Sequence, residues 1–156
     1  MQNNKPDKAD VIALPPLMYG TALGLGLCIH FVFPVQFLPQ QGRLWFGALL
    51  PLLAVPIVVS AVRALARAKT TVDVRKPTAA IVTDGAFRCS RNPMYVSLTL
   101  LYLGIASLIN SLWVLLLVVP LLVVVERGVV EPEERYLERK FGQEYLRYKE
   151  QVRRWI

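Results

Sequence analysis

Long runs without charge divide this chain into apolar segments joined by polar connections. Lys, Arg, Asp and Glu are all absent from residues 11–42, 44–62 and 92–125. A helix needs about 20 predominantly apolar residues to cross a bilayer. The pattern therefore predicts an all-α integral membrane protein.

The run at 92–125 is too long for one span. At about 1.5 Å per residue it would reach about 51 Å, against a hydrocarbon core of about 30 Å. Asn110 and Ser111, which favour turns, lie in its middle. We therefore expect a helical hairpin here, four spans in all, and a single domain over the whole chain. The spans are predicted at residues 15–33, 44–62, 93–109 and 112–130.

Small residues and prolines refine three of these spans. Gly20 and Gly24 have the spacing that lets a second helix approach closely. Pro51 and Pro56 are expected to kink or loosen the second span. Gly104 in the third span predicts close approach by a helix or a ligand.

Basic residues mark the polar connections. Connector 63–91 holds seven bases against two acids, and we expect irregular backbone there after a short helical extension of the second span. Segment 131–156 is predicted to form two short amphipathic helices separated by Gly142. Of the 18 Lys and Arg residues, only Arg43 falls in a predicted outer loop. The positive-inside rule then places both termini in the cytoplasm, and we expect a bacterial inner membrane.

The net charge of +7 raises the question of a nucleic-acid partner. The bases flank the apolar runs, however, so we expect membrane lipids and no nucleic acid as partners. Cys28 and Cys89 have the spacing of neither a metal site nor a disulfide framework. No cleavable signal is expected, because acids alternate with Lys5 and Lys8 and the following apolar run is long.

Asn92 and Pro93 read as a helix start and carry the first candidate chemistry. Asn can accept hydrogen bonds from orphan amides at an N-cap, and Pro is tolerated at the first helical position. Arg88 and Arg91 flank this start. Free amides beside guanidiniums predict a site for an anionic group. Alternatively, the two arginines only anchor the protein at the membrane surface.

The segment after Val130 supplies a second charged stretch. Glu133 and Glu134 would fall in the first turn of a helix that starts at Pro132, where the macrodipole favours acids. Arg127 is expected either to pair with its neighbour Glu126 or to hold an acidic acceptor. Tyr145 and Tyr148 fit either a site or the interface, and Arg153, Arg154 and Trp155 are expected at the lipid head groups.

Two motifs in order give a family resemblance. Residues 91–95, Arg-Asn-Pro-Met-Tyr, resemble the Arg-His-Pro-x-Tyr motif of the isoprenylcysteine carboxyl methyltransferase family, which is related to the phospholipid N-methyltransferases. Residues 133–148 look like its Glu-Glu…Leu…Phe-Gly…Tyr…Tyr signature. Residues 81–87 look like its Leu-Val-Thr-x-Gly-x-Tyr approach. The resemblance covers about residues 72–154, roughly half of the chain.

The resemblance implies a membrane methyltransferase that uses S-adenosylmethionine on a lipophilic acceptor with a carboxylate, amine or thiol. Catalysis would fall to Arg91, beside the cofactor carboxylate, and to Arg127, which would hold an acidic acceptor. Asn92 stands where the family has His and cannot titrate near neutrality. The chain also ends at Ile156 without the family's Pro-containing tail. Carried over by position, the cofactor contacts would be Ala80, Ile81, Val82, Phe87, Asn92, Pro93, Met94, Tyr95 and Glu133.

Two other functions stay open from the sequence. Sterol reductases share this membrane architecture and C-terminal pattern but use NADPH, whose 2′-phosphate would want bases beyond Arg88 and Arg91. A non-catalytic membrane module with the same fold is the third hypothesis. In the leading hypothesis, the segment after Val130 closes the cytoplasmic side, so the acceptor is expected to enter sideways from lipid.

Overall fold

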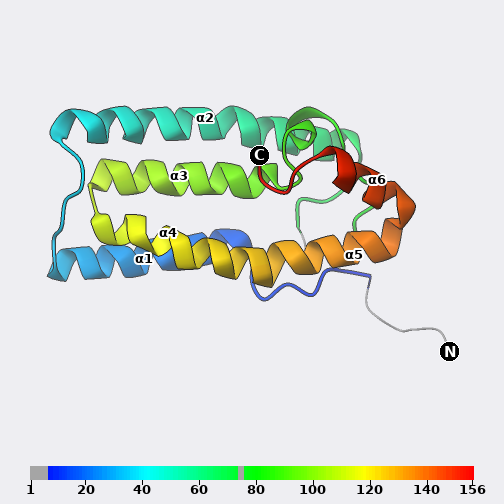
Figure 1. The fold of residues 1–156 in the computed structure, drawn as a ribbon, viewed down its shortest axis with the longest axis horizontal. Helices are drawn as coiled ribbons and strands as arrows, with labels where there is room; N and C mark the ends of the chain where they lie inside the picture. Colours follow the sequence, from blue (N-terminus) through cyan, green and yellow to red (C-terminus); the bar gives the residue numbers. More distant parts are fainter. Residues whose placement is uncertain (1–6, 74–75) are drawn as a thin grey trace.

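The computed structural model describes residues 7–73 and 76–156, which form a bundle of long helices (Figure 1). Residues 1–6, and Val74 and Arg75 of the expected connector, lie outside the described residues. No strand occurs in the described residues, so the expected all-α class is confirmed. The bundle contains α1 (Pro15–Val32), α2 (Gln40–Arg67), α3 (Pro93–Ile109) and α4 (Leu112–Val125).

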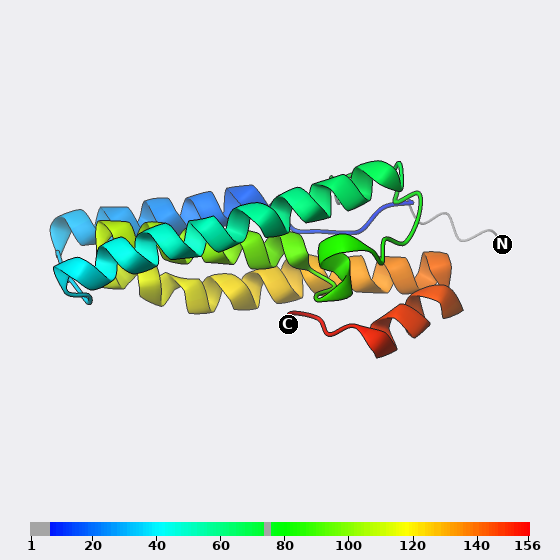
Figure 2. The same ribbon diagram turned by 90° about the horizontal axis from the view of Figure 1, so that it is seen from above.

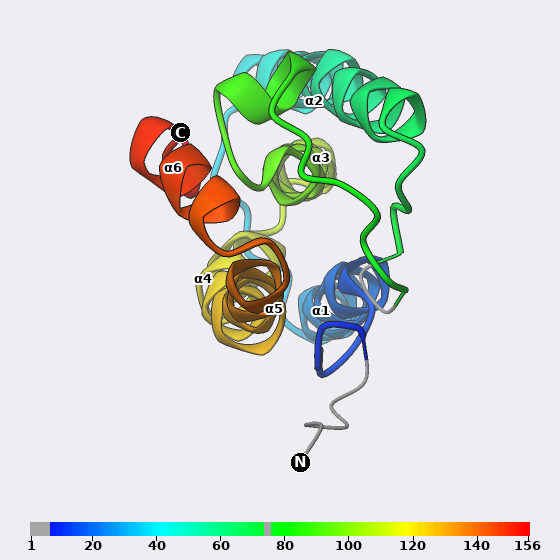
Figure 3. The ribbon, with the colours of Figure 1, turned by 90° about the vertical axis from the view of Figure 1, so that its right-hand side faces the viewer.

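Three helical stretches are long and apolar enough to cross a membrane. They are Pro15–Val32, Gln40–Arg67 and the continuous stretch Leu112–Phe141. The fourth apolar helix, α3, has only 17 residues, at the lower limit for a span. Viewed along the bundle, α3 lies between α2 on one side and α1 and α4 on the other (Figure 3). Length and composition thus identify three spans, and α3 is a shorter apolar helix among them.

Successive helices of the bundle run in alternating directions. The N-terminal segment 7–14, the connector 68–92 and the residues after Val130 therefore gather at one end, on the right in Figures 1 and 2. We call this the connector end. As expected, the second span extends as helix α2 into this region, and the connector beyond it has irregular backbone.

Helices α2 and α3 pack closely around glycine. A Cβ atom added to Gly104 would lie 2.5 Å from Cδ of Pro51, so the proline ring occupies the space that a side chain would fill. The expected close approach at Gly104 is therefore by a helix. The expected loosening does not interrupt α2, which runs continuously through Pro51 and Pro56.

The glycine pair expected to pack in α1 does not do so. Gly20 and Gly24 are exposed, and a Cβ added to either would meet nothing within 4 Å. The close approach is at Gly26, where a Cβ would lie 2.8 Å from Cγ2 of Val114 on α4. At about 100° per residue, Gly26 lies on nearly the opposite face from Gly24.

The hairpin between α3 and α4 is confirmed. Asn110 ends α3 in the left-handed conformation, with φ of 58°. Its Oδ1 accepts hydrogen bonds from the amides of Phe37 and Leu38 at 3.1 and 2.9 Å. Ser111 Oγ then accepts from the Val114 amide at 3.3 Å and caps α4. One Asn side chain thus ties this turn to the loop between α1 and α2.

The helix that begins with α4 does not end at Val130, where the fourth span was predicted to end. It continues through a π-helical turn, η2 (Glu126–Val130), into α5 (Glu131–Phe141). The expected new helix start at Pro132 is therefore wrong. Pro132 has no N–H, so in an α-helix the carbonyl of Gly128 would lack its partner. That carbonyl instead accepts the Ile12 amide at 3.0 Å, and the turn widens without breaking the helix. As expected, Gly142, with φ of +54°, separates α5 from α6 (Gln143–Gln151).

The N-terminal segment lies along η2 and α5 rather than trailing away (Figure 1). The Asp7 carboxylate accepts a hydrogen bond from the Tyr136 hydroxyl at 2.8 Å and pairs with Lys140 Nζ at 2.7 Å. A Cβ added to Gly128 would lie 2.6 Å from Ile12 Cδ1, so the end of the Ile12 side chain lies closely against this glycine. These contacts fix the approach to α1.

The packing predicts opposite outcomes for two glycine substitutions. We expect Gly104→Ala to lower the free energy of unfolding by about 1–3 kcal/mol, because the rigid ring of Pro51 cannot yield to a methyl group. Gly24→Ala is the matched control and should be neutral or slightly stabilising, because alanine favours helix at an open position. Thermal unfolding in detergent would measure both, and equal stability of the two variants would contradict the packing described for α2 and α3.

Candidate functional site

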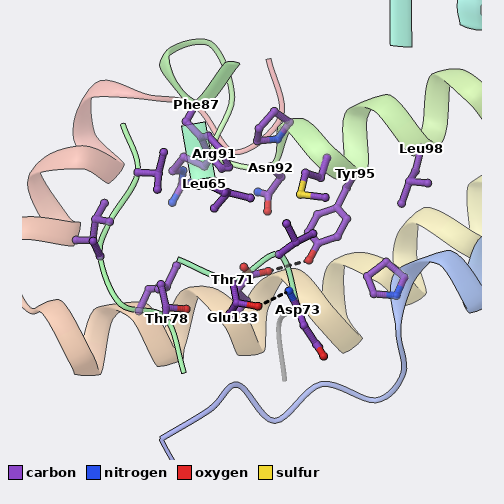
Figure 4. A pocket seen from close by; sticks show the side chains of 18 of the residues that line it. Leu65, Thr71, Asp73, Thr78, Phe87, Arg91, Asn92, Tyr95, Leu98 and Glu133 are labelled. Carbon is purple, nitrogen blue, oxygen red and sulfur yellow. Dashed lines mark hydrogen bonds between the residues drawn. The ribbon is translucent and has the colours of Figure 1, made fainter. Parts of the chain in front are cut away.

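A cavity of about 410 Å³ opens at the connector end (Figure 4). Its walls come from the start of α1, the end of α2, the connector, the start of α3, and from α5 and α6. The lining residues are Leu14, Pro15, Pro16, Leu65, Thr71, Val72, Asp73, Thr78, Ala80, Ile81, Val82, Phe87, Arg91, Asn92, Pro93, Met94, Tyr95, Leu98, Glu133, Leu137, Tyr145 and Tyr148.

The cavity collects most of the site residues named from the sequence. All nine expected cofactor contacts line it, although they come from the connector, the start of α3 and α5. Arg91 lines it too. Arg127 does not: its side chain is exposed on η2, outside the cavity lining. Glu126, the ion-pair partner expected for Arg127, pairs with Arg154 instead.

A tight turn holds the connector against α2. Gly85 begins the 3₁₀ turn η1 (Gly85–Arg88) with φ of +59°, and a Cβ there would lie 2.9 Å from Ser60 Oγ. The same hydroxyl accepts the Ala86 amide at 3.0 Å. Next along the turn, the carbonyl of Phe87 accepts the Tyr148 hydroxyl at 2.7 Å. The turn thereby fixes Phe87 between α2 and α6, at the wall of the cavity.

Asn92 precedes α3 as expected, but its side chain does not cap the helix. No N–H of α3 donates to it. Its Nδ2 instead donates to the carbonyl of Arg154 at 3.0 Å, and the Asn92 amide donates to Ser90 Oγ at 3.0 Å. The predicted capping role is therefore wrong, because the side-chain amide of Asn92 donates to the carbonyl of Arg154 instead. Pro93 occupies the first turn of α3 as expected.

Tyr95 joins α3 to α5 inside the cavity. Its hydroxyl donates to Oε2 of Glu133 at 2.8 Å, a contact drawn in Figure 4. On its other side, the carbonyl of Tyr95 accepts the Thr99 hydroxyl at 2.8 Å, and Thr99 Oγ1 lies 2.7 Å from the hydroxyl of Tyr19 on α1. The Glu133 carboxylate is thus held at a defined place on the cavity wall, with one oxygen engaged by Tyr95.

A buried ion cluster lies beside this wall. Arg91 Nη1 is 3.1 Å from Oε1 of Glu134, and the two side chains are only 8% and 7% exposed. Arg154 Nη2 and Nε donate to Glu134 at 2.9 and 3.2 Å, and its Nη1 donates to Glu126 at 2.6 Å. Arg154 is therefore engaged within the protein, not at lipid head groups. Nε and Nη1 of Arg91 are buried and make no hydrogen bond with a described residue.

The aromatic residues of the last segment are also internal. Tyr145 and Tyr148 are buried and line the cavity, so they are not interface aromatics. Burial raises the pKa of both hydroxyls above their usual range. Both phenols therefore stay neutral at physiological pH. Trp155 packs against the hydrophobic core instead of ending the chain at the membrane surface.

Sequence reasoning missed the walls supplied by the N-terminal segment and the early connector. Leu14 and Pro16 lie where the pattern marks only the start of a span, and Thr71 and Thr78 lie in a polar connector. Neither stretch has a periodicity that points to a site. The sequence did contain one signal, because Tyr136 is an aromatic residue among charged ones. In the structure its hydroxyl accepts a hydrogen bond from the Thr78 amide.

Comparison with known proteins identifies a family. A family model described as phospholipid methyltransferase matches residues 42–144. A Haemophilus influenzae protein described only as uncharacterized is 41% identical over 63 residues, which are 40% of this chain and 100% of that protein. No solved structure matches the chain.

The Tyr95–Glu133 contact generates a stability prediction. Tyr95→Phe removes a hydrogen bond to a carboxyl group, and we expect a loss of about 1.5–3 kcal/mol in the free energy of unfolding. Tyr19→Phe is the matched comparison, because its hydroxyl meets the neutral hydroxyl of Thr99, and about 1 kcal/mol is expected. Denaturant titration in detergent would rank them. A larger loss in Tyr19→Phe would mean that Glu133 is not held through Tyr95.

Proposed function

This chain belongs to the phospholipid methyltransferase family, and on that premise we propose that it transfers a methyl group from S-adenosylmethionine to a lipophilic acceptor. The supporting observation is that one cavity brings together a carboxylate and a buried guanidinium whose Nε makes no hydrogen bond with a described residue. Arg91 supplies the guanidinium and Glu133 the carboxylate. The methionine end of S-adenosylmethionine carries a carboxylate and an ammonium group, which need those two partners.

Arg91 would bind the cofactor carboxylate. Its Nε makes no hydrogen bond with a described residue, its Nη1 has only the ion pair with Glu134, and the buried side chain lines the cavity. A buried donor left without a partner costs about 1–3 kcal/mol, so an anionic ligand that accepts from it is favoured. The start of α3 adds the positive end of a helix dipole at the same wall.

Glu133 would accept hydrogen bonds from the ammonium group or the ribose hydroxyls, because Tyr95 engages only its Oε2. The rings of Phe87 and Tyr95 would face the sulfonium, since aromatic faces attract cations. Ala80, Ile81 and Val82 would provide apolar wall. When bound, the cofactor supplies an electrophilic methyl group. The protein then has mainly to align the acceptor with it and exclude water, so no acid–base dyad is required.

The cavity favours this cofactor over NADPH. Arg91 is the only Lys or Arg among the described residues that line it, and that residue also faces Glu134. A dinucleotide with a 2′-phosphate would need further bases there. This observation supports methyl transfer over the reductase hypothesis.

We further propose that the whole chain acts as one domain, with the connector end on the cytoplasmic side of a bacterial inner membrane. The basic residues on the connector and the last two helices support this orientation through the positive-inside rule. The cofactor would then enter from the cytoplasm, where it is made.

The acceptor would enter from the lipid. Leu14, Pro16 and Leu98 form an apolar part of the cavity lining where α1 and α3 begin. An acceptor with an acyl or prenyl tail could pass there between helices, whereas α5 and α6 cover the other side (Figure 3). The reactive carboxylate, amine or thiol of the acceptor would have to lie near Tyr95 in the cavity.

Cofactor binding provides the direct test. Calorimetry on the purified protein in detergent should show binding of S-adenosylmethionine. Glu133→Ala should weaken it by about 1.5–3 kcal/mol, the usual contribution of a charge-assisted hydrogen bond. Glu131→Ala is the control, because Glu131 lies on the same helix, pairs with Arg135 and does not line the cavity. Absence of binding by the wild-type protein would refute the proposed function, and equal affinity of the two variants would remove Glu133 from the site.

Acceptor entry can be tested with paired substrates. Methyl transfer to acyl- or prenyl-tailed acceptors should be faster than transfer to their tail-less, water-soluble analogues. Arg127, which is exposed on η2, would hold an acidic acceptor. Arg127→Ala should therefore lower turnover while leaving cofactor affinity unchanged. Equal rates for tailed and tail-less acceptors would rule out lateral entry.

A further inference from the structure

The C-terminal strap, residues 152–156, is tied to the turn that precedes α3. After α6 the chain runs back along the bundle (Figure 2). The carbonyl of Arg153 accepts the Arg91 amide at 3.0 Å. The carbonyl of Arg154 accepts both Asn92 Nδ2 at 3.0 Å and Ser90 Oγ at 3.3 Å. The strap lies beyond residues 42–144, which the family model matches.

The side chain of Arg154 is held as firmly as its backbone. Its Nη2 and Nε donate to the two oxygens of Glu134 at 2.9 and 3.2 Å, the forked arrangement that guanidinium and carboxylate favour. Its Nη1 donates to Glu126 at 2.6 Å. Arg154 therefore joins η2, α5 and the start of α3 from one position.

Glu134 is shared unequally by two arginines. Arg154 makes hydrogen bonds to both carboxylate oxygens, whereas Arg91 lies at ion-pair distance, 3.1 Å, without hydrogen-bond geometry at its Nε or Nη1. Arg154 thus takes the forked pairing across both oxygens of this buried carboxylate, the geometry that a second guanidinium would also need. If Arg154 were absent, Glu134 would be free to take Arg91 in the same forked pairing and neutralise it.

We propose that Arg154 is a positioning residue that occupies Glu134 and so keeps the guanidinium of Arg91 available to the carboxylate of the bound cofactor. This inference rests on the proposed function, because it concerns how S-adenosylmethionine is held. It assigns the C-terminal strap a part in recognising one chemical group of the cofactor rather than in general stability.

The test compares two ligands that differ by that group. S-adenosylmethionine and its decarboxylated analogue share the sulfonium, the amine and the adenosine, but only the first has a carboxylate. Affinities measured by calorimetry in detergent should favour S-adenosylmethionine in the wild-type protein. In Arg154→Gln its affinity should fall by at least about tenfold, while that of the analogue changes by less than about twofold. The ligand preference is a readout that a purely structural role would not move.

Three further variants keep the experiment decisive. Arg154→Lys retains the charge without the fork and should retain part of the preference, and it serves if Arg154→Gln does not fold. Glu134→Gln combined with Arg154→Gln should restore preference for the carboxylate, because no carboxylate remains to capture Arg91. Arg147→Gln, an exposed arginine on α6, should behave as wild type.

The outcomes separate the two proposals. If the wild-type protein binds neither ligand, the proposed function fails. If it binds S-adenosylmethionine but Arg154→Gln weakens both ligands equally, Arg154 only supports the fold and the inference is overturned. The same holds if the double variant fails to recover the preference while its thermal unfolding remains cooperative.

Discussion

One buried carboxylate organises the connector end of this protein. Removing Glu134 from water costs several kcal/mol unless cations and hydrogen bonds compensate. Its compensation comes from residues far apart in the sequence, Arg91 before α3 and Arg154 near the C-terminus. The requirement to satisfy this charge brings α5, the start of α3 and the C-terminal strap together. The cavity adjoins this cluster, because Arg91 lines it together with Glu133 and Tyr95.

The features that the sequence predicted are those encoded by neighbouring residues. Runs without charge define the helices of the bundle, and Asn110 can adopt the left-handed turn between α3 and α4. The cavity residues at 80–82 and 91–95 could also be predicted, because each group lies in one contiguous motif. The resemblance to one family gives the order of these motifs along the chain. The common placement of these stretches with Glu133 follows from the antiparallel hairpin.

The features that the sequence did not predict depend on choices between equivalent partners. Asn92 has a side chain that can cap a helix, but a carbonyl supplied some 60 residues later competes for it. Gly24 and Gly26 are the same residue in the same helix. Only the rotation of α1 about its axis decides which of them packs against α4. In the sequence, nothing distinguishes Arg154 from the other basic residues near the C-terminus. Only the fold brings Glu126 and Glu134 beside it. Long-range contacts of this kind leave no periodic trace in the chain.

The π-helical turn η2 links the orientation of α5 to the number of residues that precede it. Such a turn holds one residue more than an α-helical turn would. Deleting one residue between Glu126 and Val130 would restore regular winding, and α5 would keep nearly the same orientation because the wide turn already absorbs the extra residue. Deleting a residue from the regular helix of α4 would instead rotate everything beyond it by about 100°, and Glu133 and Glu134 would leave their partners although neither had changed. A change of one residue in length is therefore expected to be tolerated at η2 more readily than within α4.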